Sequence, residues 1–237
     1  MPFSADTLDF LFENRMHDSR EWFAAHHDRY RKSVLEPLRQ LVVELTPSIL
    51  SIDGELGCEP KVDRTICRIW RDTRYTHDPS LYRDNMWIIF KRGGRMHGTD
   101  YPGFYFDLSG SGFGYGCGFY AASTGYMNTL RGLILEGDPD YRRAQKSLAR
   151  CKQYQMDGDF YKRPHYPDRP APERQWLERR NIGFNALSKD FELLFSDRLA
   201  AFLEGELLQL APVYHFLLKA AKLEQQRLAA LDSAQRQ

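Results

Sequence analysis

The chain has 237 residues, of which 42% are hydrophobic and 27% charged, a composition that suits one globular domain with a substantial core. The 33 basic and 32 acidic residues nearly balance, so the overall charge does not favour nucleic acid or an anionic membrane as a partner. We expect a cytoplasmic protein without a membrane span, because no long apolar run or secretory signal occurs and the four cysteines form no C-x-x-C pair.

The first fifty residues are expected to be helical. Ser4 can cap a first helix, and Asp18 followed by Glu21 resembles a capping box that opens a second helix. Pro37 suits the first turn of a third helix, whose apolar residues recur at helical spacing. Residues 3–52 are therefore predicted to be a helical region.

Residues 61–120 are expected to form the sheet, because short segments rich in aromatic and β-branched residues alternate there with Gly, Asp and Pro. The linker Ser109-Gly-Ser-Gly112 predicts an antiparallel hairpin between the last two segments. The predicted strands are Ile66–Trp70, Met86–Lys91, Phe104–Leu108 and Phe113–Tyr120.

Residues 123–231 are expected to be helical again, apart from a long ordered surface loop at 156–172 that contains four prolines. The fold class is therefore α+β, as one domain over 1–237 with a mainly antiparallel central sheet flanked by N- and C-terminal helices. The helical signals are a cap at Thr124, Asp138-Pro139, Pro172–Arg180, a break near Pro212 and a frayed tail after about Leu231.

Four arginines lie within eleven residues, interleaved with apolar side chains such as Ile69 and Trp70. This mixture indicates guanidinium groups held on a rigid, partly buried element, where they can bind an anion or a carboxylate. The alternative is a structural ion-pair network, since Asp72 can orient a neighbouring guanidinium without any ligand. The next segment adds Tyr82 and Arg83. The four arginines are Arg64, Arg68, Arg71 and Arg74.

A row of alternate glycines marks the last predicted strand. Gly114, Gly116 and Gly118 fall on one face of this strand and leave its backbone bare. Because glycine weakens a strand, such a row indicates close approach by a ligand or by another element, for example the helix near Thr124. The glycines alternate within a strand and so do not form a dinucleotide-binding turn.

No cofactor or metal is predicted. The seven histidines are dispersed without metal-ligand spacing, and no P-loop or nucleophile elbow occurs. Arg131 lies one turn after Met127 on a predicted helix, from which it can either reach the sheet or remain solvated.

Several of these segments resemble the DUF2461 family of uncharacterised bacterial and fungal proteins, over about Phe3 to Lys222. The most specific is the string R-I-x-R-D-x-R-[FY], and the resemblance implies no activity. Where the family usually reads D-K-x-P-Y-K, this chain has Pro79 in place of the lysine, which argues against a function that needs an ammonium there. The segments are Trp22-Phe23, Arg68–Tyr75, Asp78, Tyr82-Arg83, Gly103–Leu108, Gly116–Tyr120 and Leu130-Arg131.

The favoured hypothesis is a binding or catalytic pocket for a small anionic ligand that bears phosphate or carboxylate. One alternative is a structural or protein-interaction domain with a buried Arg–Asp network, and another is a nucleic-acid-binding module. The sequence does not decide whether the protein is an enzyme, nor its oligomeric state. The candidate ligand-binding residues are Arg68, Arg71, Asp72, Arg74, Tyr82, Arg83, Tyr105, Gly116, Gly118 and Arg131.

Overall fold

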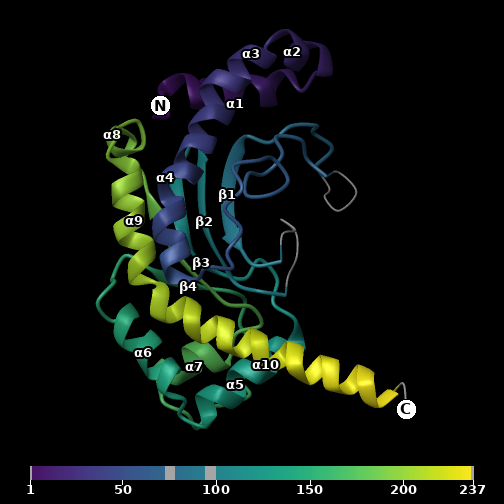
Figure 1. The fold of residues 1–237 in the computed structure, drawn as a ribbon, viewed down its shortest axis with the longest axis vertical. Helices are drawn as coiled ribbons and strands as arrows, with labels where there is room; N and C mark the ends of the chain where they lie inside the picture. Colours follow the sequence, from purple (N-terminus) through teal and green to yellow (C-terminus); the bar gives the residue numbers. More distant parts are fainter. Residues whose placement is uncertain (1, 73–77, 94–99, 236–237) are drawn as a thin grey trace.

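A computed structural model describes residues 2–72, 78–93 and 100–235 of the chain. In these ranges five antiparallel strands form one sheet in the order β1-β2-β3-β5-β4. Helices from both ends of the sequence accompany the sheet (Figure 1), so the predicted α+β class is confirmed.

The strands are β1 (Asn85–Lys91), β2 (Gly103–Ser109), β3 (Gly112–Gly118), β4 (Gln155–Asp157) and β5 (Gly183–Ser188). The helices are α1 (Ala5–His17), α2 (Arg20–Ala25), α3 (His27–Tyr30), the π-helix η1 (Arg31–Leu35), α4 (Glu36–Ile52), α5 (Thr124–Leu135), α6 (Pro139–Leu148), α7 (Ala171–Leu177), α8 (Phe191–Leu194), α9 (Leu199–Gln209) and α10 (Ala211–Gln235).

Two of the expected helix caps are shifted by one residue. Ser19, not Asp18, caps α2 and accepts a hydrogen bond from Trp22 N at 3.2 Å. The carboxylate of Asp18 instead accepts Leu81 N at 2.8 Å, so it ties the end of α1 to a distant segment. In the same way Ser123, not Thr124, caps α5. Local sequence identifies the region of a cap, but competing partners select the residue.

Prolines mark two helices as predicted. Pro37 lies in the first turn of α4, and Pro139 lies in the first turn of α6 behind its cap Asp138. The break near Pro212 is confirmed, because α9 ends at Gln209 and α10 begins at Ala211.

Helix α10 is longer than expected, since it continues to Gln235 without fraying after Leu231. Its C-terminal part stands away from the rest of the molecule (Figure 1).

Among the helices of the described ranges, none combines the length and apolar character that crossing a bilayer requires.

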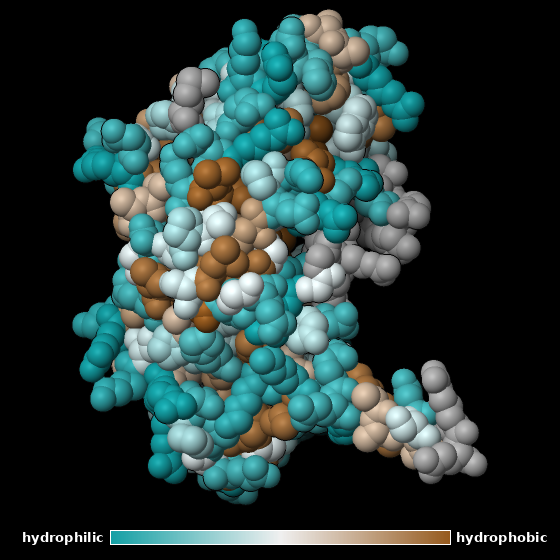
Figure 2. Space-filling view, viewed as in Figure 1, coloured by the Kyte–Doolittle hydropathy of each residue, from teal (hydrophilic) through white to brown (hydrophobic). Residues whose placement is uncertain are grey.

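The apolar side of the sheet is covered by helices α4, α9 and α10 (Figure 1). Phe104 of β2 packs on Tyr214 of α10 with ring centroids 4.9 Å apart, and Tyr115 of β3 packs on Phe202 of α9 at 5.5 Å. On the surface seen in Figure 2, apolar side chains lie in small separate groups among polar ones. The main core therefore lies between the sheet and these helices.

Two parts of the sheet differ from expectation. The segment Ile66–Trp70 is not a regular strand, and it makes isolated bridges from Ile66 to Ile88 and from Trp70 to Tyr82. In addition, β4 and β5 come from the region predicted to be helical, and β5 lies between β3 and β4. The sequence Gly183-Phe-Asn-Ala-Leu-Ser188 has few β-branched residues, so its pairing with β3 decides its conformation.

In the proline-rich loop predicted at 156–172, two backbone N–H groups are held by a buried carboxylate. Glu178 accepts hydrogen bonds from His165 N and Tyr166 N, both at 2.8 Å. The start of this segment is strand β4, which the sequence did not predict.

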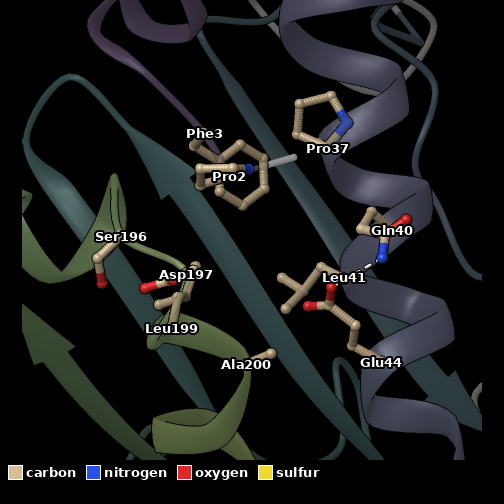
Figure 3. Close-up of a pocket in the computed structure, with 10 residues that line it drawn as sticks. All are labelled: Pro2, Phe3, Pro37, Gln40, Leu41, Glu44, Ser196, Asp197, Leu199 and Ala200. Carbon is tan, nitrogen blue, oxygen red and sulfur yellow. Dashed lines mark hydrogen bonds between the residues drawn. The ribbon is translucent and has the colours of Figure 1, made fainter.

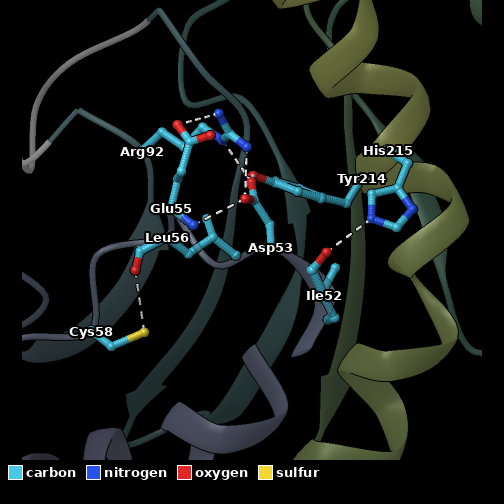
Figure 4. Close-up of polar contacts among 8 residues, drawn as sticks. All are labelled: Ile52, Asp53, Glu55, Leu56, Cys58, Arg92, Tyr214 and His215. Carbon is cyan, nitrogen blue, oxygen red and sulfur yellow. Dashed lines mark hydrogen bonds and ion pairs between the residues drawn. The ribbon is translucent and has the colours of Figure 1, made fainter. Parts of the chain in front are cut away.

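Another buried carboxylate joins three elements (Figure 4). Asp53, at the end of α4, accepts two hydrogen bonds from the guanidinium of Arg92, each at 2.6 Å, and one from the hydroxyl of Tyr214 at 2.5 Å. The side chains of Asp53 and Arg92 are only 6% and 11% exposed. Since Arg92 follows β1 and Tyr214 lies on α10, this cluster fixes α4, the end of β1 and α10 relative to one another.

Acid is expected to weaken the fold through Asp53. Burial alone would raise its pKa, but hydrogen bonds from Arg92 and Tyr214 lower the pKa to about 2, below the ordinary value of 3.8. A lowered pKa stabilises the folded state above pH ~4 by roughly 2 kcal/mol, and this contribution disappears as the pH falls towards 2. Urea unfolding at pH 7, 4 and 3 measures it. An Asp53→Asn variant should show a shallower pH dependence, and an unchanged slope would contradict the assignment.

Candidate functional site

The side of the sheet opposite the helices carries the glycine row, and we call it the glycine face. The register of the strands places four residues in one row across it, from β1 to β5. The row is Trp87, Asp107, Gly114 and Leu187. The neighbouring row contains Tyr105, Gly116 and Asn185.

The glycines make room for side chains of β2. A Cβ atom on Gly114 would lie 2.5 Å from Oδ1 of Asp107, and one on Gly116 would lie 3.0 Å from Cε1 of Tyr105. None of the atoms nearest these two positions belongs to the helix near Thr124. The bare backbone therefore lets an acidic and an aromatic side chain lie over β3.

Asp107 is a half-buried carboxyl group in the middle of this face. Within the described residues it has no hydrogen bond or ion pair, and burial raises its pKa above the ordinary value. Tyr105 lies beside it, and burial, together with the charges of Asp107 and Asp157, raises the pKa of the Tyr105 hydroxyl. A carboxyl group without a partner in such surroundings is suited to accept a hydrogen-bond donor from a ligand.

Arg71 and Arg83 reach the same side of the chain through a short bridge. Arg71 N donates to Leu81 O at 2.8 Å and Arg83 N donates to Ile69 O at 2.9 Å, so the two arginines are diagonal neighbours on one side. The guanidinium of Arg83 lies over the ring of Trp87, which belongs to the glycine face. The arginine pair therefore borders the glycine face.

The guanidinium of Arg83 lies over the ring of Trp87, 4.5 Å from its centre. Its Nε atom is buried without a hydrogen-bond partner, and no carboxylate within the described residues pairs with the group. Burial lowers the pKa of Arg83, and the positive charge of Arg71 lowers it further. A half-buried cation repelled by a second cation is suited to bind an anion.

Arg71 is anchored by an acidic group. Its Nη2 atom lies 3.3 Å from a carboxylate oxygen of Asp78, which also pairs with Arg15 at 2.7 Å. Hydrogen bonds from the Ser80 side chain and backbone hold the pKa of Asp78 at about 2. Asp78 therefore stays ionised at neutral pH and positions Arg71.

Two of the other predicted residues, Arg68 and Tyr82, do not join this group. Arg68 is 62% exposed and pairs with Asp63, whereas Asp72 is exposed and its negative charge acts on Arg83. Arg74 lies outside the described residues. Tyr82 is fully buried on the opposite side of the bridge, where its ring lies 4.3 Å from Trp70, because alternation points it away from Arg83.

Arg131 also lies elsewhere, buried under the chain that follows α7. It donates to Leu177 O at 2.8 Å, to Arg179 O at 2.7 Å and to the hydroxyl of Tyr161 at 2.9 Å. The structure thus uses this guanidinium to hold backbone carbonyls, and it does not bring Arg131 to the glycine face. Gly118 does lie on that face, paired with Gly103 and Gly183.

Comparison with known protein families identifies the family of the chain. A family model described as a conserved hypothetical protein (DUF2461) matches residues 6–216 of the 237-residue chain. The chain belongs to the DUF2461 family. No curated protein matches it, and no solved structure matches it either.

Sequence reasoning missed two side chains at the centre of this DUF2461 site, Trp87 and Asp107. The signal was available, because the hairpin at Ser109–Gly112 sets Asp107 opposite Gly114 and Tyr105 opposite Gly116. A charged residue at the centre of an otherwise apolar strand is a further sign, because ionisable groups are rarely buried without a partner.

The cysteines and acidic groups do not assemble a metal site. Within the residues that the structure describes, no cluster of three His, Cys, Asp or Glu side chains is placed to hold a metal ion. All four cysteines are free thiols. Cys67 accepts Trp87 N at 3.1 Å, and its pKa rises to about 12, mainly through burial, so it is an unreactive thiol.

Hollows elsewhere on this DUF2461 protein suit an anion less well. A hollow of about 110 Å³ between α4 and α9 is lined by Phe3 and Leu41, but the carboxylates of Glu44 and Asp197 also line it and would repel an anion (Figure 3). A hollow of about 450 Å³ beside α6 is lined by Arg143, Lys146 and Arg150, all of which are exposed. Exposed basic side chains on a helix are the ordinary solvated surface, and they bind anions weakly.

Proposed function

We propose that the glycine face binds a small anionic ligand, bearing phosphate or carboxylate, at Arg83 and Arg71. One observation carries the proposal. Arg83 is held half-buried over Trp87, beside a second guanidinium, with no carboxylate partner among the described residues. A buried charge is normally paired, so a cation held in this way favours an anion supplied from outside.

The surroundings of Arg83 support a bound molecule of limited size. The Arg83 guanidinium lies over the Trp87 ring, and a planar guanidinium can bind two oxygens of one anion at once. Leu187 lies in the same row of the glycine face and is 85% exposed, so it offers an apolar surface to the rest of the ligand.

The competing hypotheses explain other arginines better. Arg68 and Arg131 have polar partners within the protein, as the structural alternative requires, whereas Arg83 has no carboxylate partner among the described residues. The balanced total charge gives no broad footprint for nucleic acid. A cytoplasmic location belongs to the same proposal, since four free thiols suit a reducing compartment.

An Arg83→Gln variant is expected to bind small anions about 10- to 100-fold more weakly, because a charged hydrogen-bonding group is lost. Inorganic phosphate, phosphorylated metabolites and dicarboxylates are screened by thermal shift, and each hit is measured by calorimetry. Arg150→Gln is the matched control, because Arg150 lines the exposed basic hollow beside α6, and it should bind as the wild type does.

Equal affinity of the wild type and Arg83→Gln for every hit would contradict the proposal. So would binding confined to short oligonucleotides with a steep loss at high salt, which would favour the nucleic-acid alternative. Near-ultraviolet circular dichroism checks that the variant is folded.

A further inference from the structure

The glycine face holds two opposite charges, each without a partner among the described residues. Arg83 contributes a cation at the margin of the face, and Asp107 contributes a carboxyl group at its centre. The two do not form an ion pair with each other, although both lie next to Trp87.

The fold keeps these charges apart. Trp87 lies directly opposite Asp107 in the β1–β2 register, and the guanidinium carbon of Arg83 lies over the Trp87 ring, 4.5 Å from its centre. On its other side Asp107 rests over Gly114, where no Cβ displaces it. The two groups therefore lie apart in the structure, on different neighbours, and they do not neutralise each other.

We infer that the ligand is bifunctional, with an anionic group at Arg83 and Arg71 and a protonated amine or similar N–H cation at Asp107. This inference rests on the proposed function and names the class of ligand, which is a small amino-bearing phosphate or carboxylate.

The chemistry of the face favours a cationic group over a neutral one at Asp107. A half-buried carboxylate gains most from a charged donor, which both hydrogen-bonds to it and stabilises its ionised form. The neighbouring polar groups do not supply that charge, because Tyr105 is a neutral phenol and Asn185 donates to Asp157 at 2.9 Å. A simple dianion without an amine would place negative charge near Asp107 without compensation.

The test compares aminoalkyl phosphates of two to four carbons with alkyl phosphates of the same lengths, and ω-amino acids with the matching alkanoates. For at least one length the wild type should bind the amino-bearing probe 10-fold or more tightly than its partner. Asp107→Asn keeps the shape of the side chain and should reduce this ratio to about one, with little change for the alkyl probes. Arg83→Gln should weaken both members of a pair.

The outcomes separate the inference from the proposed function. Equal binding of both members of every pair by the wild type, with loss in Arg83→Gln, would overturn the inference and leave the anion site standing. An amine preference that survives in Asp107→Asn would also overturn the assignment to Asp107. Binding that Arg83→Gln does not change would overturn both.

Discussion

An Asp53→Ala variant is expected to lose about 3–5 kcal/mol of unfolding free energy, because removing one member of a buried ion pair leaves the other charge uncompensated. Among the described residues the Arg92 side chain, which is 11% exposed in the wild type, would keep only the exposed Glu55 as a counterion, and the hydroxyl of Tyr214 would lose its acceptor. Urea unfolding at pH 7, followed by far-ultraviolet circular dichroism, measures the loss.

Glu55→Gln is the matched control, because Glu55 contacts the same guanidinium at 2.5 Å but its side chain is 71% exposed. An exposed pair contributes little, so this variant should lose less than about 1 kcal/mol. Arg92→Ala added to Asp53→Ala should cost much less than Arg92→Ala alone, since the two residues act as a unit. Equal losses from Asp53→Ala and Glu55→Gln would show that burial does not determine the strength of this cluster.

This cluster also bears on the candidate site. Asp53 directly precedes the segment that leads to Cys67 and Arg71, and Arg92 directly follows β1, which carries Trp87. Loss of the cluster would therefore loosen both of these segments, which border the glycine face. Binding should therefore be measured with variants of Arg83 and Asp107, because these residues are not part of the cluster.

Much of the fold could be predicted because local signals agreed with tertiary packing. Three strands and most helices follow from apolar periodicity, and the caps and prolines mark helix starts to within a residue. Strand β5 could not be found in this way. Its segment is poor in β-branched residues, and it becomes a strand because it completes the hydrogen bonds of β3, which is a long-range effect.

The chemistry of the candidate site could be predicted from the sequence more fully than the residues that form it. The arginine string indicated the right segment, yet Tyr82 faces the core and Arg131 binds backbone carbonyls under α7. Whether an arginine has an acidic partner depends on residues that are distant in the sequence. Arg15 of α1, for example, forms an ion pair with Asp78. Asp107 was detectable only by combining the hairpin register with the glycine row.

A Gly116→Ala variant, in the glycine row of β3, is expected to lose about 3 kcal/mol or more of unfolding free energy. The added Cβ would lie 2.1 Å from the carbonyl oxygen of Phe184, which is backbone of the neighbouring strand and cannot rotate away. The β3–β5 pairing must therefore open at this point. Thermal and urea unfolding measure the loss.

Alanine substitutions at two other glycines serve as controls for Gly116→Ala. Gly132→Ala, in α5 with no atom within 4 Å of the new Cβ, should stabilise the protein by roughly 0.5–1 kcal/mol, as alanine does in a helix. At Gly114 the added Cβ meets the movable carboxyl group of Asp107 and the Leu187 side chain. Gly114→Ala should therefore cost less than Gly116→Ala, while it displaces Asp107 and weakens amine recognition. If Gly116→Ala were as stable as the wild type, β3 and β5 could not be paired in this register, and the register would no longer place Leu187 and Asn185 on the glycine face.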